Sequence, residues 1–472
     1  MGLVTPVGLV EVSELGGVHF IAIGGSGMNG IASALLQLGV EVSGSDRQDS
    51  KYLRALEAQG ARVHVGHDAA QLGSARTVVA SSAIREDNPE LAEARRRGLR
   101  VLHRSAALGS IMLGRRGVAV AGTHGKTTTT AMIAHVLSRL GADPSYVIGG
   151  ALTGASTGGH IGSGSAFVVE ADESDGSFLQ YPAEIAVVTN VDPDHLSNWG
   201  TAENYADGFE RFATGESVRL LVISADDPGA VELTERVRSS GGERPRIVTF
   251  GESEGADVRI TDAAFAGTGS TLALDSEPIR LNVPGAYNVW NAAATYAVAL
   301  DLGADAAAVR AELETYGGTN RRFQLIGTVD DIRVYDDYAH HPTEVANTLR
   351  AARTGVGESG RVVVCFQPHL YTRTRDFWRE LAAALELADQ AIVMDVCGDR
   401  EDPIPGVDGA MVAAAVTPGT ATVTYEPDWD SAAPVVAGIA RPGDLVITVG
   451  CGDVTKVAPL IVEALHGERG VG

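Results

Sequence analysis

The residues with the clearest chemical potential follow the apolar run 118–121, where the chain reads Gly-Thr-His-Gly-Lys-Thr-Thr before a segment with helical periodicity. Backbone N–H groups in such a turn, with the positive end of the next helix, form a binding site for a triphosphate. Lys126 would reach the β- and γ-phosphates, and the Thr127 hydroxyl would bind Mg²⁺. The alternative is an ordinary glycine-rich turn, because Val120 stands where a phosphate loop usually has its first glycine. We expect the chain to bind ATP through Gly122, Thr123, His124, Gly125, Lys126, Thr127 and Thr128.

Two further strand ends carry groups that suit a metal ion. The apolar run 166–169 is followed by an acidic segment, in which Glu170 is the first candidate for a Mg²⁺ ligand and Glu173 the second. The alternative is a solvated acidic turn. His195 follows the apolar run 185–190 and could help to hold a second metal ion or a phosphate, or could bond to a nearby backbone carbonyl.

A second glycine-rich turn lies near the start of the chain. Gly25, Gly27 and Gly30 fit the pattern G-x-G-x-x-G between an apolar strand and a helix, and Asp46 lies about 20 residues further on, where a ribose-binding acid is expected. This arrangement favours a nucleotide or pyrophosphate site. The alternative is a βαβ unit whose glycines only allow close packing. Ser82 would lie on the same edge of the sheet if its strands are parallel.

Two asparagines mark the start of a later, alanine-rich helix. Asn288 and Asn291 are three residues apart, so their amides share one helix face. Two amides there suit a nucleobase or a ribose, but Asn near a helix N-terminus is also a common cap. The residues leave both interpretations open.

In the last third of the chain, three apolar strands each end in a polar cluster. Ligands bind outside the carboxyl ends of the strands of an open parallel sheet. We therefore expect the three clusters to lie together at one edge. The strands are 332–335, 362–366 and 445–449, and the clusters that follow them are 336–344, 367–376 and 450–456.

Composition limits the partners. The net charge of −23 argues against a general nucleic-acid or anionic-membrane partner. There is no basic region before Arg47 and no run of about 18 apolar residues, so neither a signal peptide nor a membrane insertion is expected. The three cysteines show neither pairing nor metal spacing, which favours a reducing cytoplasm.

Length and residue usage predict the organisation that positions these groups. A chain of 472 residues is too long for one core and suggests about three domains. Abundant Gly and Ala and only 5 % aromatic residues suit an α/β fold with many tight turns. We expect a Rossmann-like N-terminal domain (1–114), a P-loop-type central ATPase with a parallel sheet (115–320) and a Rossmann-like C-terminal domain (321–472).

The order of these motifs resembles the Mur ligase family. The segments that carry the resemblance are 24–32, 122–128, 170–175, 336–344 and 366–376. The resemblance implies an ATP-dependent ligase in which the lactyl carboxylate of UDP-N-acetylmuramate is phosphorylated and the amine of L-alanine attacks the acyl phosphate. The ligase would bind UDP-N-acetylmuramate, L-alanine, ATP and Mg²⁺. It would be a monomer or a homodimer.

The resemblance also implies residue roles. Catalysis would rest on Lys126, Glu170, His195 and Arg322. Metal ions would be held by Thr127, Glu170 and His195. The nucleotide would further contact Asn288, Asn291, Arg322 and Asp337. The UDP sugar would contact Gly25, Gly27, Gly30, Asp46, Ser82 and His124, and the amino acid His341, His369 and Arg373.

The chain departs from the family pattern in three places. Residues 196–212 contain no Lys, so the carbamylated lysine of related ligases is absent, and 395–403 lacks the family's usual short turn. Cys451 stands where a small alanine is expected. We hypothesise that Cys397 or Cys451 reports on domain closure; the alternative is that all three thiols, including Cys365, are buried packing groups.

Three other functions compete with this interpretation. A recycling ligase that adds a whole tripeptide to the same UDP sugar would share most of the motifs. An NAD-dependent dehydrogenase would rest on the first glycine motif alone. A catalytically silent nucleotide-binding protein would require the loss of Lys126, Glu170 or the double-His segment, and all are present.

Overall fold

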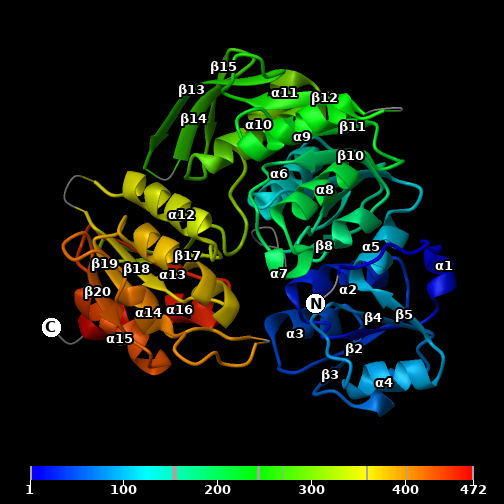
Figure 1. Ribbon diagram of the computed structural model, residues 1–472, viewed down its shortest axis with the longest axis horizontal. Helices are drawn as coiled ribbons and strands as arrows, with labels where there is room; N and C mark the ends of the chain where they lie inside the picture. Colours follow the sequence, from blue (N-terminus) through cyan, green and yellow to red (C-terminus); the bar gives the residue numbers. More distant parts are fainter. Residues whose placement is uncertain are drawn as a thin grey trace. The chain divides into compact units, whose positions relative to one another are not determined.

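The computed structural model describes residues 3–150, 157–241, 245–267, 269–357, 360–399 and 401–469. The chain forms two compact units, each of α/β architecture (Figure 1). The first unit comprises Met1–Thr261, Ala273–Ile279 and Trp290–Tyr316. The second comprises Asp262–Leu272, Arg280–Val289 and Gly317–Gly472.

The N-terminal sheet has the strand order β3-β2-β1-β4-β5 and is parallel throughout. Its central strand is buried along its whole length, as strands of parallel sheets are. The strand order reverses at β1, so the loops after β1 and β4 frame the crevice where such sheets bind ligands. The strands are β1 (Val18–Ile21), β2 (Val42–Asp46), β3 (Arg62–Val65), β4 (Thr77–Ala80) and β5 (Arg100–His103). The helices are α1 (Val12–Leu15), α2 (Ser26–Gln37), α3 (Lys51–Ala58), α4 (Pro89–Arg96) and α5 (Arg104–Met112).

The central sheet, in the described part of the chain, has the order β15-β14-β13-β12-β11-β10-β6-β9-β7-β8. Strand β6 lies between β9 and β10 and is parallel to both, so the carboxyl ends of these three strands meet at one edge. The strands are β6 (Arg116–Ala121), β7 (Ser145–Val147), β8 (Gly159–His160), β9 (Ala166–Glu170), β10 (Ala183–Val188), β11 (Leu220–Ser224), β12 (Arg246–Gly251), β13 (Val258–Ala266), β14 (Gly269–Leu274) and β15 (Glu277–Leu281). The helices are α6 (Lys126–Arg139), α7 (Leu196–Trp199), α8 (Ala202–Ala213), α9 (Pro228–Ser239), α10 (Tyr287–Asp301) and α11 (Ala306–Glu314).

Helix α2 of the N-terminal sheet packs closely on the central sheet. A Cβ at Gly30 would lie 3.1 Å from Val147 Cγ1 and 3.2 Å from the carbonyl carbon of Gly158. The Gly158 N–H donates a hydrogen bond to Asn29 Oδ1 at 3.3 Å. The third glycine of the G-x-G-x-x-G pattern therefore allows close packing between two sheets, which is the alternative that the sequence left open.

The second unit contains a sheet of order β16-β17-β21-β18-β19-β20, in which β16 is antiparallel and the other pairs are parallel. The strands predicted at 332–335, 362–366 and 445–449 are the neighbours β17, β18 and β21, so the three polar clusters lie along one edge, as expected. The strands are β16 (Gln324–Val329), β17 (Ile332–Asp337), β18 (Val362–Phe366), β19 (Gln390–Val393), β20 (Thr422–Tyr425) and β21 (Leu445–Val449). The helices are α12 (Pro342–Gly355), α13 (Tyr371–Leu385), α14 (Gly409–Ala413), α15 (Trp429–Ile439) and α16 (Val457–Arg469).

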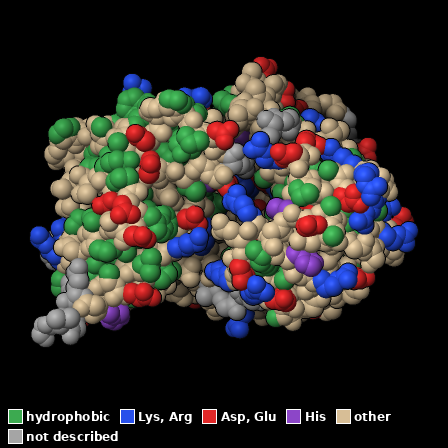
Figure 2. Space-filling model, turned by 90° about the horizontal axis from the view of Figure 1, so that it is seen from below, with side chains coloured by type: hydrophobic (Ala, Val, Ile, Leu, Met, Phe, Trp, Pro, Cys, Tyr) green, Lys and Arg blue, Asp and Glu red, His purple; other side chains and the backbone are tan. Residues whose placement is uncertain are grey.

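The surface carries charges of both signs. On the face shown in Figure 2, basic and acidic side chains are interspersed. None of the helices described here has both the length and the apolar character needed to cross a membrane.

Candidate active site

The turn between β6 and α6 has the backbone geometry of a phosphate loop. Gly125 caps α6 with φ +83°, in the left-handed region that favours glycine. A Cβ at this position would also lie 2.9 Å from the side-chain oxygen of Asn291. That oxygen accepts a hydrogen bond from Thr129 Oγ1 at 3.0 Å. The structure thus brings Asn291 of α10 against the loop, where it braces the start of α6.

Lys126 bends back over its own turn. Its Nζ donates to the carbonyl oxygens of Gly122, at 2.7 Å, and Thr123, at 3.0 Å, and lies 2.9 Å from Glu173 Oε2. Burial alone would lower the pKa of Lys126, but Glu173 and other nearby acids outweigh burial and raise that pKa. Burial raises the pKa of Glu173 to about 8, against the opposing effect of Lys126. Lys126 is therefore a charged group held beside the loop.

Thr127, in the first turn of α6, and Glu170, the last residue of β9, bring two side-chain oxygens together. Thr127 Oγ1 donates to Glu170 Oε1 at 2.9 Å, and the Gly149 N–H donates to Glu170 Oε2 at 2.8 Å. A hydroxyl and a carboxylate are the kind of hard oxygen donors that Mg²⁺ takes. These residues fit a magnesium ion, with Glu170 rather than Glu173 next to the hydroxyl.

His195 lies at the start of α7 with its ring directed at carboxylates. Its Nε2 is 3.3 Å from Asp194 Oδ2 and 3.9 Å from Glu173 Oε1. Its backbone has φ +54°, which is uncommon for a residue other than glycine and is found at functional sites. The structure thus joins His195 to the Lys126–Glu173 pair through the acidic segment.

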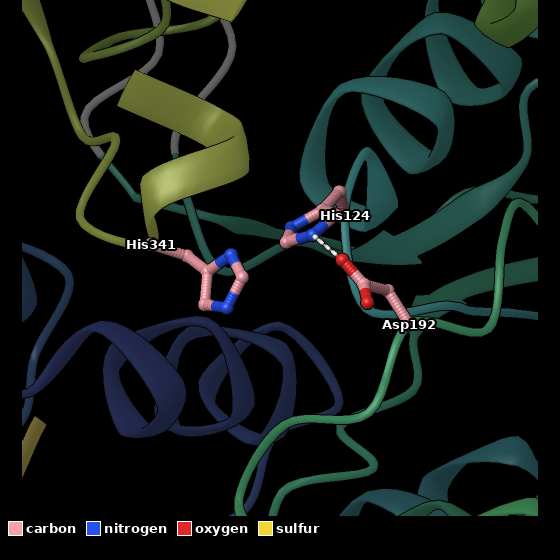
Figure 3. A group of neighbouring side chains, drawn as sticks. All are labelled: His124, Asp192 and His341. Atoms are coloured by element: carbon pink, nitrogen blue, oxygen red, sulfur yellow. Dashed lines mark hydrogen bonds and ion pairs between the residues drawn. The ribbon is translucent and has the colours of Figure 1, made fainter. Parts of the chain in front are cut away.

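The loop after β10 holds the phosphate loop from the other side. Thr189 Oγ1 donates to the carbonyl oxygen of His124 at 2.6 Å, and the His124 N–H donates to Asn190 Oδ1 at 2.9 Å. His124 Nε2 lies 3.4 Å from Asp192 Oδ2, the contact drawn in Figure 3. Figure 3 also labels His341, which belongs to the second unit.

The residues expected to hold a UDP sugar surround the loops after β1 and β4. Asp46 Oδ2 accepts a hydrogen bond from the Gly24 N–H at 2.9 Å, so this acid stabilises the glycine turn itself. A Cβ at Gly27 would lie 3.3 Å from a terminal guanidinium nitrogen of Arg104. Ser82 Oγ donates to Asp175 Oδ2 at 2.6 Å. The structure therefore brings the first glycine turn and Ser82 into the same compact unit as the phosphate loop.

Arg104 is the residue that the sequence analysis missed. It begins α5, its side chain is only 16 % exposed, and its Nη2 lies 2.6 Å from Asp172 Oδ2. The signal for it was indirect: the segment 170–175 contains four acids, which Lys126 alone cannot neutralise.

In the second unit, the predicted amino-acid-binding residues surround the loops after β17 and β18. His341 caps α12, and its side chain accepts a hydrogen bond from the Thr343 N–H at 3.4 Å. His369 Nε2 lies 4.0 Å from Asp399 Oδ2, and its ring centroid lies 6.4 Å from that of His340.

Arg373 lies in the first turn of α13 and acts electrostatically on His340 and Cys451. Burial lowers the pKa of His340 to about 3, and the positive charge of Arg373 adds to this effect. The same guanidinium opposes the rise that burial causes in the pKa of Cys451. One cluster beside Cys451 therefore contains His340, His369 and Arg373. His341 is the next residue in the chain after His340.

Asp337 and Arg322 have surroundings that the sequence did not predict. Asp337 is buried, and its carboxylate accepts hydrogen bonds from the Phe323 N–H, the Ala339 N–H and Thr348 Oγ1. It therefore anchors the chain at Phe323, just before β16, to β17 and α12. The Arg322 guanidinium lies 5.1 Å from the centre of the Tyr338 ring, a cation–π distance.

Asn288 lies on the first turn of α10, and its Nδ2 donates a hydrogen bond to the Pro284 carbonyl oxygen at 2.7 Å.

The three cysteines are free thiols. Burial raises the pKa of Cys365 and of Cys451 to about 12 and also raises that of Cys397. None of them is therefore an activated thiolate. Cys365 is a buried packing group, whereas a role for Cys397 or Cys451 in domain closure stays a prediction. Arg400, in the segment 395–403, lies outside the described residues.

Comparison with known proteins gives one consistent result. Residues 17–116 match the model "Mur ligase family, catalytic domain", 120–299 "Mur ligase middle domain" and 321–452 "Mur ligase, glutamate ligase domain". A UDP-N-acetylmuramate–L-alanine ligase of Cutibacterium acnes is 55 % identical over 472 residues, covering 99 % of this chain and 100 % of the relative.

Solved structures agree with this match. The UDP-N-acetylmuramate–alanine ligase of Thermotoga maritima is 28 % identical with a TM-score of 0.81, covering 96 % of this chain and 100 % of that one. A murein peptide ligase of Psychrobacter arcticus shares the fold at 23 % identity and a TM-score of 0.71, over 95 % and 98 % of the two chains. The predicted three-domain α/β fold is therefore confirmed. The chain belongs to the Mur ligase family of ATP-dependent ligases.

Proposed function

We propose that this enzyme joins L-alanine to the lactyl carboxylate of UDP-N-acetylmuramate, with ATP converted to ADP and phosphate. The observation that carries this function is the placement of Lys126 and Thr127, at the start of α6, beside the acidic segment that begins with Glu170 at the end of β9. A full-length relative named for this reaction shares 55 % of its residues with the chain, whereas the murein peptide ligase shares 23 %. The tripeptide-recycling alternative is therefore not favoured.

Phosphoryl transfer between two anions depends on charge neutralisation. The triphosphate would replace Glu173 and the loop carbonyls as the partner of Lys126, and the N–H groups at the start of α6 would face its phosphates. Thr127 and Glu170 would hold one Mg²⁺ and His195 a second. When bound, these ions would neutralise charge on the γ-phosphoryl group and the attacking carboxylate.

The lactyl carboxylate oxygen would form a bond to the γ-phosphorus while the bond to ADP breaks. The alanine amine would then attack the acyl carbon, lose a proton and expel phosphate. His124, oriented by Asp192, lies at the phosphate loop and would contact the muramoyl group. Arg373 would bind the alanine carboxylate by its guanidinium fork, and His341 and His369 would orient the amine.

The remaining assignments follow from this function. The nucleotide would contact Asn288, Asn291, Arg322 and Asp337, and the UDP end would contact the glycine turn, Asp46 and Ser82. We assign the boundaries of the three domains to 1–114, 115–320 and 321–472. The reaction would be a step of peptidoglycan precursor synthesis in the cytoplasm and would support cell shape and division. The enzyme would act as a monomer or a homodimer.

Phosphate release tests the function. With ATP, Mg²⁺ and UDP-N-acetylmuramate present, one reaction receives L-alanine and a second receives the tripeptide L-Ala-D-Glu-diaminopimelate. We expect release that requires both the UDP sugar and free alanine. Release with the tripeptide alone would assign the recycling reaction, and no release in either reaction would refute the ligase function.

A further inference from the structure

The acidic segment 170–175 faces two different parts of the first unit. On the side of the phosphate loop, Glu170 accepts a hydrogen bond from Thr127 and Glu173 forms an ion pair with Lys126. Its two remaining acids contact the N-terminal sheet instead. The segment therefore touches the loops of both proposed substrate sites.

The first contact to the N-terminal sheet is an ion pair. Arg104 Nη2 lies 2.6 Å from Asp172 Oδ2, and the side chains are only 16 % and 31 % exposed. The guanidinium lies against Gly27, in the glycine turn expected to face the diphosphate of the UDP sugar. Asp172 also acts electrostatically on Lys126. Asp172 thus pairs with Arg104 and also acts on the charge of Lys126.

The second contact is a hydrogen-bonded group formed with the loop after β4 and the end of β5. Ser82 Oγ donates to Asp175 Oδ2 at 2.6 Å and lies 3.1 Å from His103 Nε2. Asp175 Oδ1 accepts from the Ser177 N–H at 3.0 Å. The side chains of Asp175 and His103 are only 9 % and 17 % exposed. Asp175 therefore fixes Ser82, a proposed UDP-sugar ligand, from the central sheet.

The segment itself is tightly held. The Ala171 N–H donates to the Val120 carbonyl at 2.9 Å, next to the phosphate loop. Trp199 Nε1 donates to the Glu173 carbonyl at 2.9 Å, and Asn198 Nδ2 donates to the Ser174 carbonyl at 2.8 Å. Because its backbone is fixed at several points, the segment can transmit a change at one face to the other.

We infer that Asp172 and Asp175 are positioning residues that couple nucleotide binding to UDP-sugar binding. This inference rests on the proposed function. A triphosphate and Mg²⁺ would give Lys126 and Glu170 new partners. Because the segment is fixed as one piece, this change would pass through Asp172 to Arg104 and through Asp175 to Ser82.

Calorimetric titration of UDP-N-acetylmuramate, with and without a non-hydrolysable ATP analogue and Mg²⁺, measures this coupling in the full-length enzyme. In the wild type we expect tighter binding with the nucleotide, by a factor in the usual allosteric range of about 5–150. Asp172→Asn and Asp175→Asn should each bring this ratio close to one, and Asp175→Asn should do so while leaving the affinity for the nucleotide itself unchanged. Arg104→Gln should also bring the ratio of UDP-sugar affinities close to one. Arg104→Lys keeps the charge and should give a ratio between that of Arg104→Gln and that of the wild type.

Glu184→Gln is the matched control, because Glu184 forms an ion pair of similar length, 2.7 Å, with Arg116 at the opposite end of the central strands. It should keep the wild-type ratio. A ratio of one in the wild type, or a wild-type ratio in both aspartate variants, would overturn the inference while leaving the ligase function intact. A wild type that binds no UDP sugar would refute the proposed function and this inference together. The two aspartate variants are independent, so loss of folding in one leaves the other as the test.

Discussion

Thr127 and Glu170 are hydrogen-bonded through their side chains at 2.9 Å although 43 residues separate them in the chain. Because β6 and β9 are neighbouring parallel strands, their carboxyl ends bring a helix-start hydroxyl to a strand-end carboxylate. A pair of hard oxygen donors beside a phosphate loop is the arrangement that a nucleotide-bound magnesium ion requires.

Glu170→Gln should weaken the use of Mg²⁺. The amide keeps the size of the side chain and can still accept from the Gly149 N–H, but it loses the negative charge. We expect kcat/KM for ATP to fall by roughly 10²–10³-fold, which is the usual effect of losing one group that stabilises charge in the transition state. Phosphate release measured against Mg²⁺ concentration should show a shift to higher concentrations. Glu184→Gln should keep the wild-type profile, and an unchanged profile for Glu170→Gln would exclude this residue as a metal ligand.

Lys126→Met should abolish phosphoryl transfer while leaving the protein folded. Burial already raises the pKa of Glu173 to about 8 against the effect of Lys126, and loss of Lys126 removes that opposing effect, so no unpaired buried carboxylate is left behind. We expect a loss of roughly 10³-fold or more in phosphate release, with the affinity for the UDP sugar retained in calorimetric titration. Substantial phosphate release by this variant would contradict the assigned role of Lys126.

Arg373→Gln should mainly impair the use of alanine. Loss of a charge-assisted hydrogen bond to the alanine carboxylate should raise the KM for alanine by roughly 10–100-fold. Steady-state kinetics with alanine as the varied substrate separates this effect from any change in the KM for ATP. The control is Arg375→Gln, because Arg375 is half-exposed and paired with its neighbour Asp376. Equal effects of the two substitutions would argue against the assignment.

His103 should make the protein less stable in acid. Burial lowers the pKa of His103 to about 4, with Arg104 acting in the same direction and Asp175 opposing. The unfolded chain takes up this proton near pH 6.5, while the folded chain takes it up only near pH 4. The free energy of unfolding therefore falls as the pH drops through this window, by about 3 kcal/mol at most.

The substitution His103→Gln removes the titrating group and retains a side chain that can bond to Ser82. We expect the difference in Tm between pH 7 and pH 4.5 to be smaller for this variant than for the wild type. Thermal unfolding monitored by fluorescence at the two pH values measures this difference. An equal loss of Tm in both proteins would show that His103 does not carry the effect.

Much of the fold could be predicted because its strands are continuous apolar runs. The expected strands at 362–366 and 445–449 coincide with β18 and β21. Other boundaries moved by a few residues. Strand β17 extends to Asp337, two residues beyond the strand expected at 332–335, and β10 ends at Val188, two residues before the end of the apolar run 185–190. Parallel strands then placed the polar clusters at common edges.

Contacts between distant elements could not be predicted. The pair Arg104–Asp172 joins the N-terminal and central sheets, and nothing local in either segment specifies its partner. The contact of Asp337 with the nucleotide, which the family resemblance implies, stays a prediction. Its hydrogen bonds to the Phe323 N–H and to Thr348 Oγ1 are tertiary features that the local sequence does not specify. The packing role of Gly30 likewise depends on Val147 of β7 and on Gly158, both far along the chain.

The central claim is that the reaction passes through an acyl phosphate of the UDP sugar. UDP-N-acetylmuramate labelled with oxygen-18 in its lactyl carboxylate tests this claim, with ATP, Mg²⁺ and L-alanine present and the released phosphate analysed by mass spectrometry. The account predicts one labelled oxygen in each phosphate released and an amide product of UDP-N-acetylmuramate and alanine. Phosphate without the label, formed together with the amide, would contradict it.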